Sequence, residues 1–403
     1  MPPVDLANME EAFEEAVKHR ESPGAALLST NKSGTFSYGK CFGRRGIDKH
    51  EQPLEMNTVM RIASATKLLT SVACMQCVER GSLNLDDAVS TVVPELGSFQ
   101  VITGFGEDEQ PILRPPERPI TLRHLLSHSS GLSYDAMHPL IIQYRKWQGI
   151  DLQPDFETIA ERFTYPLIYD PGDGWSYGPS LEWAGKVLER ATGLTLNEHL
   201  QRNICSPLGI RDMTFKLLSR PDMMERRATS CDRDEQGNLT AGDNDFWRKD
   251  FADDFGGMGC FTTPEEYFKV MTSLLRNDGK LLRPETVDLL FERQLGEAAE
   301  QGMAQIYAHP LFGQAMGHLV PKEVKKSHAL GGSLMMADAD GDSWRRKGTM
   351  VWAGLPNFIW SIDREAGVCC LYASQVRPPG DPLSLRLAEL FERAMYAESR
   401  ASG

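Results

Sequence analysis

The chain has 403 residues, enough for one large core or two lobes, and its 41% hydrophobic and 25% charged residues are the composition of an ordinary folded protein. Lysine and arginine total 43 against 56 for aspartate and glutamate, a net charge of -13 that would repel a phosphate backbone. These values argue against a disordered chain and against nucleic acid as a partner.

From the N-terminus, the pattern predicts a helix, a hairpin and a longer helix. The first helix covers Asn8–His19, and two strands, Gly24–Thr30 and Thr35–Gly43, follow on either side of a polar turn. Apolar spacing becomes helical again over Ala65–Gly81, with the last glycine as a C-cap. Ser64 is therefore expected at a helix N-terminus.

The middle of the chain, roughly 85–254, carries helical patterns between Pro- and Gly-rich connections and little of the alternation typical of strands. After Gly256–Gly257, helices are predicted over Pro264–Asn277 and over about Pro382–Tyr396. The strand-like runs between these two helices are Gly348–Gly354, Asn357–Asp363 and Gly367–Ser374.

Strands at both ends of the chain, with helices around a helical middle, predict an α/β fold of the α+β kind. We expect an antiparallel sheet flanked by helices plus a mainly helical lobe. Residues 1–84 and 255–403 would form the discontinuous α/β lobe, and residues 85–254 the helical lobe. A cleft between lobes is a usual place for a small-molecule site.

Neither a membrane nor a metal is predicted as a partner. The segment Met1–Asp5 lacks the basic and apolar parts of a secretion signal, and no uncharged run is long enough to cross a bilayer, so we expect a cytoplasmic protein. The one C-x-x-C pair among eight cysteines, Cys74 and Cys77, lies in an apolar helical stretch without a second pair. Buried thiols are the expected outcome, and no cofactor is predicted.

An S-x-x-K motif opens the predicted helix after Ser64. Residues three apart share a helix face, so the amine of Lys67 can reach the hydroxyl of Ser64. The mainly apolar run Leu68–Val72 would weaken the hold of Lys67 on its proton, as a base near neutral pH requires. The backbone N–H of Ser64 is also available to a developing oxyanion. Alone the motif is weak evidence, because long chains contain it by chance.

Further segments resemble the superfamily of serine β-lactamases, penicillin-binding proteins and esterases, especially its class C-like branch. In chain order they are Arg61–Lys67, Ile120–Leu132, Pro171–Gly178, Leu208–Phe215 and Gly256–Tyr267. The resemblance spans nearly the whole chain and is closest to fungal acyltransferases that load a short branched acyl group onto a polyketide alcohol, as in the last step of lovastatin assembly. It implies a β-lactamase/transpeptidase-like fold with its active site in the cleft.

The resemblance also implies a catalytic set. In that family a tyrosine from the helical lobe meets the Ser–Lys pair, and Tyr177 holds the matching position. Ser64 would then be the nucleophile, Lys67 its activating base, and Tyr177 a proton relay. A neighbouring ammonium makes such a relay possible because it stabilises the phenolate.

Two departures from the family pattern disfavour lactam substrates. Trp352 begins the segment where β-lactamases have Lys-Thr-Gly, so the lysine that helps to hold the substrate carboxylate is missing. Pro179 stands where lactam-binding relatives have Asn, and it has no donor of its own. Neutral esters or thioesters are favoured instead. The N–H of Leu355, after Gly354, would complete the oxyanion hole with that of Ser64.

The predicted function is a two-step acyl transfer. An acyl group would pass from a thioester or ester donor through a Ser64 acyl-enzyme to an alcohol of a polyketide-like natural product. The partners would be a small-molecule acceptor and an acyl thioester donor, free or carried by an acyl carrier domain. One alternative is a carboxylesterase that turns over short-chain esters without an acceptor. The other is a non-catalytic binding protein on this fold, which would tolerate loss of Ser64.

Two further motifs compete with this assignment. Ser176 lies in a G-x-S-x-G match, but the α/β-hydrolase elbow needs a sharp strand-to-helix turn, and a loop precedes this serine. His124 and His128 have the spacing of a zinc pair, but Leu125 replaces the Glu of H-E-x-x-H. Hydrogen bonding to nearby backbone is expected of both imidazoles.

An acceptor groove would be lined by aromatic, methionine and glycine residues, although such aromatic residues are more often core. The candidates are Tyr134, Met137, Tyr144, Trp147, Met258, Trp352 and Gly354.

Overall fold

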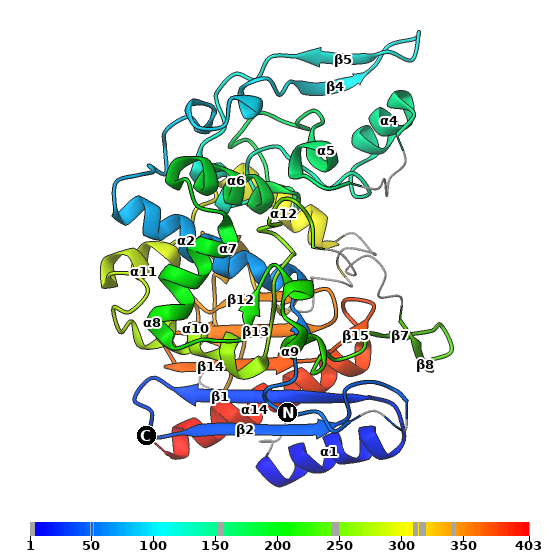
Figure 1. Cartoon of the computed structure of the whole chain (residues 1–403), viewed down its shortest axis with the longest axis vertical. Helices are drawn as coiled ribbons and strands as arrows, with labels where there is room; N and C mark the ends of the chain where they lie inside the picture. The colour runs from blue at the N-terminus through cyan, green and yellow to red at the C-terminus, as the bar shows by residue number, and fades with distance from the viewer. Residues whose placement is uncertain are drawn as a thin grey trace.

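A seven-stranded antiparallel sheet organises the computed structural model (Figure 1), which describes residues 5–48, 50, 52–150, 156–242, 250–308, 313, 320–340 and 343–402. The strands lie in the order β10-β11-β12-β13-β14-β1-β2. Their bounds are β1 Gly24–Asn31, β2 Ser37–Gly43, β10 Lys326–His328, β11 Ser333–Met335, β12 Met350–Gly354, β13 Phe358–Asp363 and β14 Val368–Ala373.

The two ends of the chain meet in the middle of this sheet. Leu27 of β1 pairs with Tyr372 of β14 on one side and with Lys40 of β2 on the other. Every residue of β1 and of β14 is buried, because helices cover both faces of the sheet. Both the hairpin and the three C-terminal strands predicted from the sequence are present.

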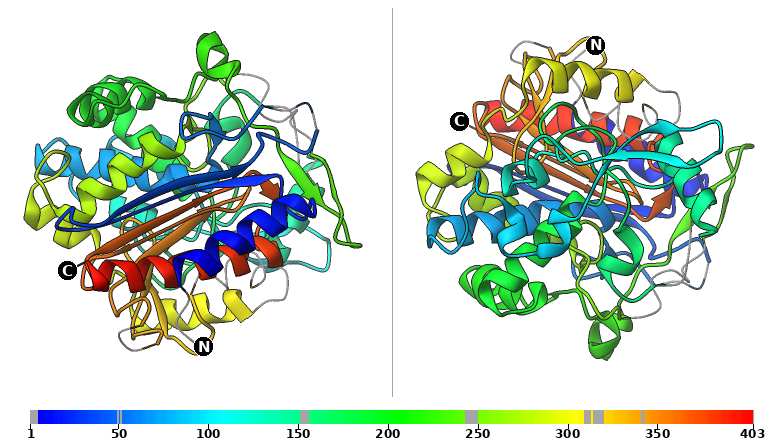
Figure 2. Two further views of the ribbon diagram at one scale, coloured as in Figure 1. Left: turned by 90° about the horizontal axis from the view of Figure 1, so that it is seen from below. Right: turned by 90° about the horizontal axis from the view of Figure 1, so that it is seen from above.

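Helices from distant parts of the sequence form the outer layers (Figure 2). The helices α1 Leu6–Lys18 and α14 Pro382–Ala401 lie side by side on one face, and α2 Thr66–Glu79 and α10 Pro264–Arg276 lie on the other. Capping fixes where α10 and α14 begin: Thr263 accepts from the N–H of Glu266, and Asp381 from that of Ser384. Each of these helices has a proline in its first turn.

Helices dominate the chain between α2 and α10. They are α3 Leu122–Leu126, α4 Pro139–Gln148, α5 Ile159–Phe163, α6 Ser180–Thr192, α7 Leu196–Leu200, α8 Ser206–Leu208 and α9 Pro221–Met224. A π-helical turn covers Gln201–Cys205, and 3₁₀ turns cover Val89–Thr91, Pro94–Gly97 and Leu217–Ser219. After α10 come α11 Pro284–Leu290 and α12 Glu297–Ala308.

Small sheets accompany these helices. One has three strands, β3 Met60–Arg61, β9 Phe261–Thr262 and β6 Met213–Thr214. A second also has three, β15 Val376–Arg377, β7 Cys231–Arg233 and β8 Leu239–Ala241. The third is a hairpin of β4 Val101–Phe105 and β5 Pro111–Arg114. The buried apolar side chains of the large sheet and of the helical region belong to one continuous cluster. Within the described residues, no helix is both long and apolar enough to cross a membrane.

Candidate active site

Ser64 lies in a 3₁₀ turn, Ala63–Ala65, between β3 and α2, so the predicted helix begins later than the sequence pattern suggests. Ala63 has φ 42°, in the left-handed region that non-glycine residues seldom adopt. Tyr267 of α10 donates its hydroxyl to the carbonyl of Ala65 at 2.9 Å. The hydrogen bond from Tyr267 therefore helps to hold the turn in a conformation that it would not favour alone.

Backbone contacts also fix the segment that precedes the turn. The amide of Gln375 accepts from the N–H of Arg61 at 3.3 Å and donates to the Arg61 carbonyl at 3.0 Å. A Cβ on Gly354, the last residue of β12, would lie 2.0 Å from the carbonyl oxygen of Ile62. Only a glycine allows β12 to run this close to the residues before Ser64.

The structure brings Ser64, Lys67 and Tyr177 together. The hydroxyls of Ser64 and Tyr177 share a hydrogen bond of 2.6 Å. The Lys67 ammonium lies 4.7 Å from the centre of the Tyr177 ring. Tyr177 comes from the loop that enters α6, 113 residues further along the chain. The helical spacing predicted that the Lys67 amine would contact the Ser64 hydroxyl. In the structure the Tyr177 phenol makes this hydrogen bond.

Lys67 is almost fully buried and donates to two oxygens. One is the carbonyl of Gly257 at 2.8 Å, and the other is the hydroxyl of Tyr134 at 3.4 Å. Tyr134 in turn donates to Glu182 of α6 at 2.9 Å. Burial raises the pKa of the Tyr134 phenol and of the Glu182 carboxyl, the latter against the opposing charge of Lys67.

Sequence analysis missed Glu182 and Gly257. The available signal for Glu182 was a charge within the otherwise uncharged run Ser180–Gly185, on a helix whose first turns are buried. For Gly257 the signal was the glycine pair itself. Tyr134 was expected only to line a groove, and its hydrogen bond to Lys67 was not foreseen.

Two backbone N–H groups are available near the Ser64 hydroxyl. Ser64 and Leu355 both line the same cavity, and in the described part of the chain neither of their N–H groups has an acceptor. Because both residues line the cavity, these N–H groups are open to a ligand. Such a pair has the chemistry of an oxyanion hole.

The cavity beside Ser64 has a volume of about 1090 Å³. Seven of the site residues predicted from the sequence line it: Ser64, Tyr134, Met137, Tyr177, Met258, Gly354 and Leu355. Its remaining lining includes the apolar side chains Phe156, Phe163, Ile168 and Ile306 and the cations Arg61, Arg162 and Arg377. A ligand that combines an apolar body with acidic or polar groups suits such walls.

Three other groove candidates are not among the described residues that line this cavity. Trp352 is buried behind it, with its ring centre 5.5 Å from that of Tyr177. Tyr144 and Trp147 pack on each other in α4, with ring centres 5.4 Å apart. Trp352 thus supports Tyr177 from behind, whereas the α4 pair lies on another surface.

The competing motifs have other surroundings. Ser176 lies in chain without regular secondary structure and follows no strand, and its N–H donates to the carbonyl of His128 at 3.0 Å. His124 belongs to the N-terminal cap of α3, where its ring accepts from the N–H of Thr121 at 3.2 Å. The backbone hydrogen bond expected of His128 is wrong: neither of its ring nitrogens has a partner among the described residues, and the ring packs against Tyr177 with ring centres 5.2 Å apart. In the described ranges, no three His, Cys, Asp or Glu side chains are grouped as metal ligands would be.

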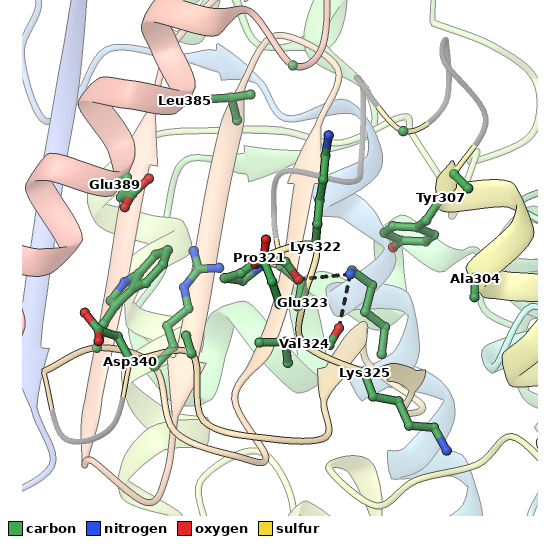
Figure 3. Close-up of a pocket in the computed structure, with 18 of the residues that line it drawn as sticks. Ala304, Tyr307, Pro321, Lys322, Glu323, Val324, Lys325, Asp340, Leu385 and Glu389 are labelled. Atoms are coloured by element: carbon green, nitrogen blue, oxygen red, sulfur yellow. Dashed lines mark hydrogen bonds between the residues drawn. The ribbon is translucent and has the colours of Figure 1, made fainter. Parts of the chain in front are cut away.

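A second cavity of about 1480 Å³ adjoins the first (Figure 3). It lies between α12, α14 and the chain before β10, and its walls carry charges of both signs. Lys326 lines it and donates to the carbonyls of Pro321 at 3.1 Å and Val324 at 3.2 Å. Gln301, Ile359 and Leu385 line both cavities.

Comparison with known proteins gives consistent matches. The model of the beta-lactamase family matches residues 9–393. Monacolin J acid methylbutanoyltransferase from Aspergillus terreus is 44% identical over 396 residues, 97% of this chain and 95% of that protein. Lovastatin esterase from Penicillium rubens is 39% identical over 98% of this chain and 99% of its own length. A mutant of simvastatin synthase (LovD) from Aspergillus terreus superposes with a TM-score of 0.92 at 44% identity, covering 98% of this chain and 95% of that chain.

Proposed function

The chain belongs to the beta-lactamase family, and on that premise we propose that it is a serine acyltransferase that moves a short acyl group onto a hydroxyl of a polyketide-like small molecule. The observation that carries this proposal is the 2.6 Å hydrogen bond between Ser64 and Tyr177 at the wall of a large cavity. Similarity to a methylbutanoyltransferase along nearly the whole chain supports the choice of acyl transfer.

The first step acylates Ser64. Its oxygen attacks the carbonyl of a thioester or ester donor while its proton passes to Tyr177, and the Lys67 ammonium stabilises the phenolate form of that relay. The N–H groups of Ser64 and Leu355 bind the oxyanion. When the intermediate collapses, the carbon–sulfur bond of a thioester breaks, and the thiol leaves with the proton that Tyr177 returns. The donor is a free thioester or one held on an acyl carrier domain.

The second step reverses these roles. The acceptor hydroxyl gives its proton to the Lys67–Tyr177 pair and attacks the acyl carbon, and the bond between that carbon and the Ser64 oxygen breaks. Ser64 then regains a proton from the pair. The chemistry needs only that an alcohol occupy the place where water would otherwise attack.

The cavity offers room for such an acceptor beside the acyl group. Its volume of about 1090 Å³ is at the upper end of what small-molecule sites usually provide. Apolar walls suit the rings of a polyketide, and an acceptor that fills them displaces water from the acyl-enzyme. Trp352, in place of the family lysine, supports a neutral donor because it offers no cation for a carboxylate.

An esterase with the same residues is the second candidate function. Lovastatin esterase is similar to this chain over its whole length, and water in place of the alcohol would complete the cycle by hydrolysis. Dependence on an acceptor separates the two. A transferase releases product in proportion to added alcohol, whereas an esterase turns over p-nitrophenyl butyrate at a rate that the alcohol does not raise.

Intact-protein mass spectrometry after incubation with a butyryl thioester tests the nucleophile. We expect a butyryl adduct on the wild type and on Ser176→Ala, and none on Ser64→Ala. Ser176 is a matched control because it lines the same cavity. If the adduct forms on Ser64→Ala and is lost from Ser176→Ala, the proposed mechanism is wrong. Addition of alcohols to the isolated acyl-enzyme then measures transfer against hydrolysis.

A further inference from the structure

The buried carboxylate of Glu182 is linked to the ammonium of Lys67 through the hydroxyl of Tyr134. Glu182 is 0% exposed, and its Oε1 accepts the Tyr134 hydroxyl at 2.9 Å. Its Oε2 has no hydrogen-bond partner among the described residues. A buried carboxylate with so little hydrogen bonding is costly unless a positive charge compensates it. We therefore expect a positive charge within the site to compensate the Glu182 carboxylate.

The backbone around Glu182 is shaped to admit this side chain. A Cβ on Gly257 would lie 2.3 Å from one carboxylate oxygen and 2.4 Å from the other, so no larger residue fits there while Glu182 keeps its place. The same glycine supplies the carbonyl that accepts from Lys67 at 2.8 Å. Gly257 thus lies between the carboxylate and the ammonium and contacts both.

Tyr134 provides the second link between the two charges. Its hydroxyl accepts from Lys67 at 3.4 Å and donates to Glu182 at 2.9 Å. A hydroxyl can do both at once, since it has one proton and two lone pairs. Lys67 is 4% exposed, so this network takes the place of the water that would solvate an exposed ammonium.

We infer that Glu182, acting through Tyr134, is a positioning residue that holds the Lys67 ammonium beneath Tyr177 and sets the pH at which Ser64 is activated. This inference rests on the proposed function. Glu182 acts through Tyr134 and not on the substrate or on Ser64. Its negative charge compensates the positive charge that the Lys67–Tyr177 pair carries before the pair loses a proton.

The charges that face Glu182 come from several elements. Lys67 of α2 and Arg162 of α5 both favour its ionised form, while the phenols of Tyr134 and Tyr165, whose pKa values burial raises, lie near it as neutral groups. Arg162 forms an ion pair with Asp135, which offsets much of its charge. Lys67 is then the cation that the carboxylate compensates. Burial raises the Glu182 pKa, and the positive charge of Lys67 opposes that rise.

The consequence is an expected pH shift. Activation of Ser64 requires the coupled Lys67–Tyr177 pair to lose one proton, whichever of the two groups releases it. The hydrogen bonds of 3.4 and 2.9 Å through the Tyr134 hydroxyl put the carboxylate within about 6 Å of the ammonium, where it opposes that loss. Coulomb's law at an effective dielectric constant of about 20 to 40 gives an effect of about 1 to 2 pH units. Removing the charge should move the acidic limb of activity to lower pH.

The test is the pH profile of kcat/KM for p-nitrophenyl butyrate, which reports the acylation of Ser64. Glu182→Gln keeps the size and the acceptor oxygen but removes the charge. We expect its acidic limb to shift down by about 1 to 2 pH units and its plateau to fall about tenfold because Lys67 is held less firmly. Tyr134→Phe keeps the charge but breaks the link, so its plateau should fall similarly with a smaller shift. The double variant should be no worse than the lower single variant.

Glu392→Gln is the matched control. This carboxylate of α14 is also buried, at 3% exposure, and it binds Arg345 and Trp344, none of the three being among the residues that line the cavity beside Ser64. We expect that variant to lose thermal stability without any shift of the acidic limb. A shift shared by both variants would indicate a general effect of lost charge and would overturn the inference.

Other outcomes are equally decisive. A folded Glu182→Gln protein with the acidic limb of the wild type overturns the inference. If that variant does not fold, a Tyr134→Phe plateau within threefold of the wild type does the same. Activity that survives Ser64→Ala overturns the proposed function and this inference together. Ser64-dependent activity with an unmoved limb overturns the inference alone.

Discussion

Replacing Gly354 by alanine should disable the site through the backbone alone. The added Cβ would lie 2.0 Å from the carbonyl oxygen of Ile62, whereas non-bonded heavy atoms are comfortable near 3.5 Å. The end of β12 and the turn that carries Ser64 must therefore separate by about 1 Å or more, and a misplacement of that size costs about a hundredfold in rate. Because the N–H donors of Leu355 and Ser64 lie on opposite sides of this contact, the oxyanion hole that we propose would widen.

The expected loss can be bounded. Removing one oxyanion donor costs about 10²–10³ in rate, or about 3–4 kcal/mol of transition-state stabilisation. Overpacking of a buried contact costs about 1–3 kcal/mol of folding stability, so a thermal shift should accompany the loss. We expect kcat/KM for p-nitrophenyl butyrate to fall about 10²–10³-fold for Gly354→Ala, mostly in kcat.

Gly39→Ala is the control for this experiment. Gly39 lies in β2 of the same sheet, and its added Cβ would meet the Met56 side chain at 3.6 Å, an ordinary contact. Its activity should remain within about threefold of the wild type. A folded Gly354→Ala protein that keeps wild-type kcat/KM would refute the argument, because it would mean that this close approach does not set the position of the donors.

Other substitutions probe the relay, the second donor and the supporting ion pair. Tyr177→Phe removes the hydroxyl that binds Ser64 at 2.6 Å and should slow acylation about 10²–10⁴-fold, whereas Tyr396→Phe, which loses a buried hydroxyl bond to Asp363, should leave the acylation rate unchanged. Leu355→Pro removes the N–H and should cost about 10²–10³ in kcat/KM, while Leu355→Ala, at an exposed side chain, should cost less than about threefold; equal losses would show that the side chain matters and the N–H does not. The hydrogen bond from Arg114 lowers the pKa of Asp170 from 3.8 to about 2, so this carboxylate stabilises the fold fully above pH 3.8 and loses its contribution as the pH falls toward 2. Asp170→Asn should therefore lower the free energy of unfolding by about 1–2 kcal/mol at pH 7, a value discounted for the solvent exposure of Arg114, and the difference from wild type measured by urea denaturation should narrow below pH 4; a difference that stays constant with pH would contradict the assignment.

The sequence predicts the long elements well because their periodicity extends over many residues. The helix expected over Pro264–Asn277 ends one residue earlier, and the three C-terminal strands match to within about two residues. The strands β10 and β11 were missed, since three residues are too few to show alternation. The start of α2 was predicted to within one residue, but the 3₁₀ turn that carries Ser64 was not foreseen, because the left-handed Ala63 depends on tertiary contacts that no local pattern records.

Site residues that lie in sequence motifs could be predicted from the sequence. Site residues that only the fold brings together could not. Ser64, Lys67 and Tyr177 were found by resemblance, since their motifs keep their order along the chain. Glu182 meets Tyr134 across 48 residues, and no motif pairs them. Helical spacing suggests contact between Ser64 and Lys67, but it cannot show that a phenol from another element reaches the hydroxyl.

The rings packed behind Tyr177 are neutral, which bears on how Lys67 and Glu182 act on this phenol. His128 and Trp352 pack on Tyr177 with ring centres 5.2 and 5.5 Å away, and His328 lies 5.6 Å from Trp352. Burial lowers the pKa of both imidazoles, that of His328 to about 4, so they are neutral near pH 7. These rings hold the phenol in place and add no charge to it. Because these rings carry no cation, the Lys67 ammonium, 4.7 Å from the centre of the Tyr177 ring, acts on the phenol without a competing charge from this wall.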